Sequence, residues 1–88
     1  MLQLSGNNSL VDLGKGDAAI LETIDLPADD ARRLMELGFL PGTRVVAGNS
    51  GPGGEPRVFQ VDGSEIALRR ETARLLKVRL EVKSTRPS

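Results

Sequence analysis

The sequence predicts a mainly β domain with one inserted α-helix, folded as a small closed or half-closed barrel. Two observations support this prediction. Apolar residues recur with a period of two in several short segments, which is typical of strands with one buried face. Between the first and second of these segments, one stretch has the three- and four-residue apolar spacing of a helix. Five short strands in 88 residues favour a barrel, because a closed sheet exposes fewer edges.

The amino-terminal part is predicted to dock onto the barrel and then enter it. Residues 1–9 are polar and are expected to be loosely ordered, as is the tail at 83–88, so the domain spans residues 10–82. Leu10, Val11 and Leu13 are expected to pack on the core before a turn at Gly14–Gly16. Residues 18–26 alternate and contain β-branched side chains, which indicates the first strand.

The main helix is predicted over residues 27–38. Pro27 is tolerated in a first helical turn. The predicted apolar face consists of Ala31, Leu34, Met35 and Gly38, so Met35 is expected in the core. Gly38 suits the left-handed position that ends a helix, where a Cβ is unfavourable.

The rest of the chain is predicted to be strands joined by tight turns. The strands are 43–50, 56–62, 64–70 and a last one from Leu76, with hairpin turns at 51–55 and Asp62-Gly63. A single helical or 3-10 turn is expected within 70–76. In the last strand, Leu76, Val78, Leu80 and Val82 alternate with charged residues, which predicts one buried and one solvated face.

Several chemistries are excluded by residues that the chain lacks. It contains no cysteine, which excludes disulfides, zinc fingers and thiol catalysis. It also contains no histidine, the usual general base and metal ligand. The stretch Gly14–Asp17 does not meet the requirements of a phosphate loop, because no Ser or Thr follows Lys15 and no helix is expected there. We therefore predict no catalytic residue and no enzymatic activity.

Charge and hydropathy favour a protein partner. Residues 1–36 carry seven acidic and three basic residues, and residues 37–88 carry five and nine, so the net charge is zero. A surface with both signs suits protein partners. One basic stretch comprises Arg69, Arg70, Arg74, Lys77, Arg79, Lys83 and Arg86. With only two aromatic residues, base stacking and hence nucleic-acid binding are not expected.

No signal peptide and no apolar run of ~20 residues is evident, so a cytoplasmic domain without membrane insertion is predicted.

Any metal site would have to use oxygen ligands. The weak carboxylate candidates are Asp29 with Asp30 and Asp62 with Glu65. Asp29 and Asp30 also suit the positive end of the helix dipole, and adjacent helical residues chelate poorly. Carboxylates alone bind transition metals weakly. No cofactor is therefore firmly implied, and a weak divalent site, such as one for Fe²⁺, stays open.

Two stretches carry a resemblance to a known family. They are RRLMELGFLPGTRV (residues 32–45) and GGEPRVFQVDGSEIALRRETARLLKV (residues 53–78). The shared pattern joins a Leu-x-x-x-Gly helix end, a Pro-Gly turn, a Gly-x-Pro hairpin exit and an Ile-Ala-Leu-Arg strand. Here these are Leu34 with Gly38, Pro41-Gly42, Gly54 with Pro56, and Ile66–Arg69. With these elements at this spacing, residues 10–82 resemble the FeoA family, ferrous iron transport protein A.

The resemblance implies an SH3-like barrel and a cytoplasmic accessory protein of ferrous iron uptake. It implies as partner a FeoB-type transporter, which has a cytosolic GTP-binding domain and a membrane permease domain. The family pattern supplies neither catalytic residues nor firmly assigned metal ligands. A small sensor or chaperone that binds Fe²⁺ through carboxylates is the alternative, and weak self-association stays open.

The corner after the helix is our candidate for the contact surface. Phe39 and Leu40 are large apolar side chains in a turn, and Arg32 and Arg33 lie on the predicted outer face of the helix. Apolar bulk beside charge is typical of an interface and its rim. The competing interpretation is that Phe39 and Leu40 cap the barrel core.

Overall fold

The computed structural model describes residues 8–81, so most of the two predicted tails and Val82 lie outside the described part. The strands are β1 (Ala18–Ile24), β2 (Arg44–Ser50), β3 (Arg57–Val61), β4 (Ser64–Leu68) and β5 (Leu76–Leu80). The helices are α1 (Ala28–Glu36) and α2 (Arg70–Ala73), and 3-10 turns form η1 (Leu10–Asp12) and η2 (Pro52–Gly54). The predicted strands and main helix are all present.

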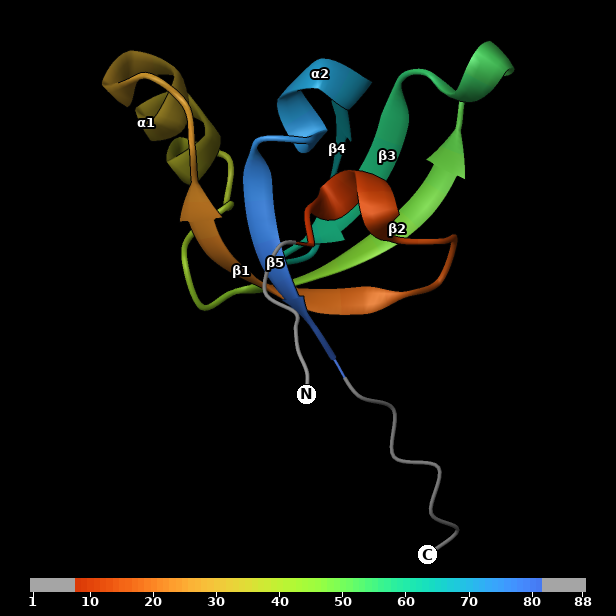
Figure 1. The fold of residues 1–88 in the computed structure, drawn as a ribbon, viewed down its shortest axis with the longest axis horizontal. Coiled ribbons are helices and arrows are strands. Elements are labelled where there is room, and N and C mark those ends of the chain that lie inside the picture. Colours follow the sequence, from red (N-terminus) through yellow and green to blue (C-terminus); the bar gives the residue numbers. More distant parts are fainter. Residues whose placement is uncertain (1–7, 82–88) are drawn as a thin grey trace, which may run out of the picture.

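The five strands form one antiparallel sheet in the order β4-β3-β2-β1-β5. The sheet curls around the core, as Figure 1 shows. Among residues 8–81, β4 and β5 form no ladder with each other, and α2 connects them along the chain. The barrel is therefore half-closed, and the predicted mainly β fold with one inserted helix is confirmed.

Local sequence explains how the turn between β3 and β4 is built. Asp62 and Gly63 have positive φ angles of 51° and 81°. A two-residue type I′ hairpin requires positive φ at both central residues, and Asp-Gly is among its preferred sequences. The hairpin sets the β3–β4 register, in which Val61 pairs with Ser64.

The core is formed by side chains from most of the elements. Its largest fully buried members are Phe39, Phe59, Leu10, Leu13, Leu21, Leu76, Val45, Val61 and Val78. The turn η1 packs against α2 and β5. The expected docking of Leu10 and Leu13 is thereby confirmed, since both are buried in this core.

Two residues expected in the core are exposed instead. Met35 is 37% exposed, because α1 buries only a narrow stripe made of Ala31 and Leu34. Leu80 is 44% exposed. It continues the face of Leu76 and Val78, but its neighbours at the end of β5 include Gly16 and Asp17, which leave it partly uncovered.

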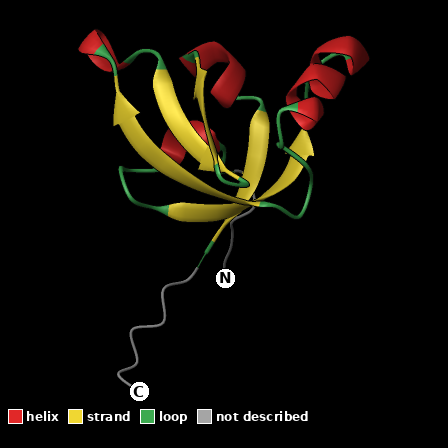
Figure 2. Ribbon diagram, turned by 180° about the vertical axis from the view of Figure 1, so that it is seen from behind, coloured by secondary structure: helices red, strands yellow, loops and turns green. Residues whose placement is uncertain are grey.

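Three of the helical elements, α1, α2 and η2, lie along one rim of the curled sheet. Figures 1 and 2, which view the molecule from opposite sides, both place α1 at one end of this rim. They place the small helical turn η2 at the other end, with α2 between them. The rim thus has two well-separated ends, and each presents a different kind of surface.

Candidate protein-contact surface

The backbone of the corner after α1 is fixed by a Schellman motif. Gly38 has φ +114°. The Gly38 N–H donates to the Met35 carbonyl and the Phe39 N–H donates to the Leu34 carbonyl, both at 3.0 Å. This pattern satisfies carbonyls at the helix end and commonly brings an apolar side chain after the glycine against one in the last turn. Phe39 and Leu34 accordingly both belong to the buried core.

Further hydrogen bonds tie the corner to β1 and β2. The Gly42 N–H donates to the Leu21 carbonyl at 2.7 Å, and the Leu21 N–H donates to the Thr43 carbonyl at 2.9 Å. The Thr43 N–H also donates to the Leu40 carbonyl at 2.9 Å. The corner is therefore held at both ends, and the position of its exposed side chains is set by the backbone.

The two halves of the predicted Phe39–Leu40 contact point in opposite directions. Phe39 is 0% exposed and lies in the core, so its side chain is not part of the accessible surface. Leu40 is 47% exposed. The structure thus places Phe39 with the core and leaves Leu40 outside, so the question that the sequence left open has a different answer for each residue.

Sequence reasoning missed two further apolar side chains at this corner. Met35 and Leu37 are both exposed, Leu37 at 47%. Together with Leu40 they form what we call the apolar corner, defined as Met35, Leu37 and Leu40. The exposure of Leu37 could have been predicted from the sequence, because Leu37 does not belong to the predicted buried face of the helix.

The predicted basic residues flank this corner on both sides. Arg32 and Arg33 are exposed on α1. Because residues three or four apart are neighbours on a helix, Arg32 lies beside Met35 and Arg33 beside Leu37. Met35 and Leu37 are two positions apart, so they lie on opposite flanks of the helix. Each flank therefore combines one apolar and one cationic side chain.

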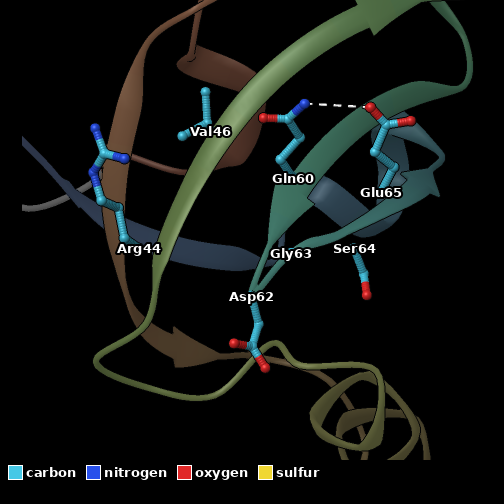
Figure 3. A pocket seen from close by; sticks show the side chains of 7 residues that line it. All are labelled: Arg44, Val46, Gln60, Asp62, Gly63, Ser64 and Glu65. Carbon is cyan, nitrogen blue, oxygen red and sulfur yellow. Dashed lines mark hydrogen bonds between the residues drawn. The ribbon is translucent and has the colours of Figure 1, made fainter.

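The four carboxylate candidates do not form one cluster. Asp29 and Asp30 are exposed in the first turn of α1. Asp62 lies in the β3–β4 turn and Glu65 lies on β4, and their side chains point in different directions in Figure 3. The Glu65 carboxylate accepts a hydrogen bond from Gln60 Nε2 at 3.3 Å. Among residues 8–81, no group of three or more acidic side chains could hold a metal ion.

A polar concavity lies beside that hairpin (Figure 3). Its volume is about 600 Å³. The residues that line it are Arg44, Val46, Gln60, Asp62, Gly63, Ser64 and Glu65. Arg44 Nε donates to both carboxylate oxygens of Glu81, at 3.1 and 3.0 Å. This hydrogen bond, and then the charge of Glu81, raise the pKa of the Arg44 guanidinium. Three of the lining side chains, Arg44, Gln60 and Glu65, thus already have a hydrogen-bond partner.

Comparison with known proteins identifies the family. The FeoA domain model matches residues 8–80, which is most of the chain. The chain belongs to the FeoA family. A comparison with curated protein sequences gave no match. Solved structures agree with the family assignment, and all those described here are FeoA proteins.

Two of these structures show how far the likeness extends. FeoA from Chlorobium tepidum has a TM-score of 0.81 and 27% sequence identity, over 85% of this chain and 71% of that one. FeoA from Stenotrophomonas maltophilia has a TM-score of 0.68 and 40% identity, over 84% and 89%. The latter was solved in complex with zinc and is described as an SH3 domain protein and a candidate activating factor of ferrous iron transport. The SH3-like fold implied by the sequence is therefore confirmed.

The family assignment and the fold describe a small accessory domain of iron transport. None of the helices between residues 8 and 81 is long and apolar enough to cross a membrane.

Proposed function

We propose that this chain is a cytoplasmic accessory protein of ferrous iron uptake that binds a FeoB-type transporter through the apolar corner. The family assignment supports the transport system. The observation that carries the contact surface is the exposure of Met35, Leu37 and Leu40 at one corner beside two arginines. The chain contributes binding to this system and no chemical step.

The chemistry of the apolar corner suits a protein contact. Interfaces gather their binding energy in a few apolar and arginine side chains surrounded by a polar rim. Leu40 supplies an apolar centre on a backbone that is already hydrogen-bonded, so little ordering is needed on binding. Arg32 and Arg33 supply positive charge on α1, which favours an acidic patch on the transporter.

A titration with a matched control tests the surface. The cytosolic GTP-binding domain of a FeoB-type transporter is titrated by calorimetry with the wild-type chain and with Leu40→Ser and Leu80→Ser. Leu80 is exposed to nearly the same extent as Leu40 but lies on β5, outside the apolar corner. We expect Leu40→Ser to weaken binding at least tenfold and Leu80→Ser to leave it within twofold.

The result also separates the two flanks of α1. Met35→Ser and Leu37→Ser are measured in parallel, because these residues lie on opposite sides of the helix. A loss confined to one of them defines the flank that faces the transporter. Equal binding by Leu40→Ser and the wild-type chain, with both folded, would exclude the apolar corner as the contact.

Divalent metal binding is the second candidate function. The observation that favours it is the zinc complex of the Stenotrophomonas maltophilia relative. In this chain the ligands would come from Asp29, Asp30, Asp62 and Glu65, with carboxylates from two molecules sharing one ion. Calorimetry with Fe²⁺ or Zn²⁺, repeated with Asp62→Asn and Glu65→Gln, tests this candidate, and light scattering tests whether metal drives dimerisation. No heat and no change in mass would remove it.

A further inference from the structure

A second surface, independent of the apolar corner, lies at the other end of the rim. It is a small pocket of about 120 Å³ between η2, β3 and α2. The residues that line it are Val11, Ser50, Gly54, Arg57, Phe59, Arg70 and Ala73. None of the residues lining this pocket belongs to α1 or to the corner that follows it.

Arg57 occupies a position on β3 where an apolar residue is expected. Side chains two apart on a strand share a face, so Arg57 lies on the same face as Phe59 and Val61. Both of these are buried in the core. The guanidinium carbon of Arg57 lies 5.9 Å from the centroid of the Phe59 ring. A cation therefore stands at the inward-facing edge of the barrel, over an aromatic floor.

Strand pairing brings a second cation to the same place. In the sheet, Arg57 pairs with Ser50 on β2 and with Leu68 on β4. Leu68 is the last residue of β4, and α2 starts at Arg70 two residues later. Arg70 thus lines the same pocket as Arg57. Two arginines therefore line one small pocket, Arg57 from β3 and Arg70 from the start of α2.

These two cations lack an anionic partner within the described chain. Among residues 8–81, no carboxylate lies within 4 Å of the guanidinium nitrogens of Arg57 or Arg70. Glu55 is close, but its carboxylate accepts the backbone N–H of Arg70 at 3.3 Å. Arg57 Nε is buried and has no hydrogen-bond partner among residues 8–81. A buried donor without a partner is rare in folded proteins and unfavourable, which makes this one a signal.

We propose that the pocket binds a carboxylate group carried on a short aliphatic stem. The guanidinium fork of arginine matches the two oxygens of a carboxylate, and the charge strengthens both hydrogen bonds. Val11, Phe59 and Ala73 provide apolar surface for the stem. The small volume of the pocket, about 120 Å³, suits a carboxylate with its first methylenes better than a larger ligand.

Binding supplies a hydrogen-bond acceptor to Arg57 Nε, which has none among residues 8–81. The incoming carboxylate draws the Arg57 guanidinium into a side-on arrangement, in which Nε and one terminal nitrogen donate together. Ser50 and Arg70 stand at the pocket wall to donate to the remaining lone pairs. The carboxylate comes either from a free small organic acid or from an acidic side chain or chain end of a protein.

Nuclear magnetic resonance of the ¹⁵N-labelled full chain tests the proposal, because the Nε–H of Arg57 gives its own signal. Sodium propionate is titrated at constant ionic strength, with propionamide as the neutral control of the same shape. Acetyl-Ala-Glu-Ala-amide and acetyl-Ala-Gln-Ala-amide form the peptide arm, and inorganic phosphate is a third probe. We expect saturable shifts of the Arg57 Nε–H and Gly54 amide signals with the carboxylates and none with the amides.

Variants confine the effect to the pocket. Arg57→Met removes the guanidinium and keeps most of the apolar stem, and we expect it to weaken propionate binding at least tenfold. Arg70→Gln is the second variant, in case the first disturbs folding, and should weaken binding severalfold. Arg74→Met is the control, since Arg74 follows α2 and is exposed but does not line the pocket. It should leave the affinity within twofold.

Each outcome decides the proposal. Tighter binding of the Glu peptide than of propionate assigns the site to a protein-borne carboxylate, and equal binding assigns it to a free acid. Absence of shifts with both carboxylates, equal shifts with the amides, binding of phosphate alone, or undiminished binding by Arg57→Met overturns it. None of these measurements involves the transporter, so failure here is distinguishable from failure of the proposed function.

Discussion

The two ends of the rim are built over the only two phenylalanines in the chain, yet they differ in what they leave unsatisfied. At one end, Phe39 anchors the apolar corner, whose backbone hydrogen bonds are made and whose apolar side chains face solvent. At the other end, Phe59 forms the floor of a pocket with a buried polar atom, Arg57 Nε, that has no hydrogen-bond partner within the described part of the chain. The first end exposes apolar side chains to solvent, and the second buries a hydrogen-bond donor that has no acceptor within the described part of the chain.

This difference separates two kinds of evidence for a binding surface. Exposed apolar side chains are common on folded proteins and by themselves indicate little. They become informative at the apolar corner because three occur within six residues on a fixed backbone. A buried donor without a partner is informative alone, because burial without a hydrogen bond opposes folding. The first kind predicts a large apolar contact, and the second predicts a small charged ligand.

The largest expected effect concerns the anchor of the apolar corner. Phe39→Ala removes a side chain that is fully buried among core residues. Such a truncation leaves a cavity and should lower the free energy of unfolding by about 3–5 kcal/mol. Urea unfolding followed by far-ultraviolet circular dichroism measures it, since the chain has no tryptophan or tyrosine for fluorescence.

The neighbouring residue is the control for this comparison. Leu40→Ala truncates an exposed side chain and should change the free energy of unfolding by no more than about 0.5 kcal/mol. Similar losses for Phe39→Ala and Leu40→Ala would mean that Leu40 also packs on the core. The apolar corner would then have no outward half.

The next effect concerns the glycine that sets the direction of both side chains. Gly38→Ala should lower the free energy of unfolding by about 1–2 kcal/mol, because φ is +114° and an L-residue is strained there. Packing is not the cause, since the nearest atoms to an added Cβ would be 3.7 Å away. D-alanine at this position, introduced by peptide ligation, should restore most of the stability. Equal losses for the two residues would point to crowding instead of backbone strain.

The two ends also differ in how much of them the sequence could predict. The end of α1 and the turn at Gly38 were predicted because helix capping depends on a few consecutive residues. The exposure of Met35 was missed because it depends on how narrow a stripe α1 buries, which the rest of the fold decides. The alternation Arg57, Phe59, Val61 could have indicated an inward-facing arginine, but no such prediction was made. The pocket itself could not be predicted, since Arg70 reaches it only through the pairing of β3 with β4.

A smaller effect is expected at the other end of the rim. Arg57→Met removes the unpartnered donor and keeps the apolar stem over Phe59, so the free energy of unfolding should stay constant or rise by up to about 1 kcal/mol. Arg57→Ala also loses the stem and should lower it. Thermal unfolding of both variants measures this. If Arg57→Met lowers the free energy of unfolding as much as Arg57→Ala does, the guanidinium contributes stabilising contacts in the free chain. The interpretation of Arg57 Nε as an unpaired donor would then be wrong.

The smallest effect is expected at Arg44, which belongs to neither end and serves as the reference for a paired, exposed guanidinium. Glu81 raises the pKa of Arg44 by hydrogen bonding and charge. A raised folded pKa stabilises the fold below the unfolded pKa, and this contribution is lost only as the pH rises through the folded value, in strongly alkaline solution. Between pH 5 and 9, the melting temperature of Arg44→Gln should therefore run parallel to that of the wild-type chain, with little offset because the pair is exposed. If Arg44→Gln shifts the melting temperature more than Arg57→Met does, ion pairing matters more than burial in this fold. The difference between the two ends would then have to be explained by ion pairs and not by burial.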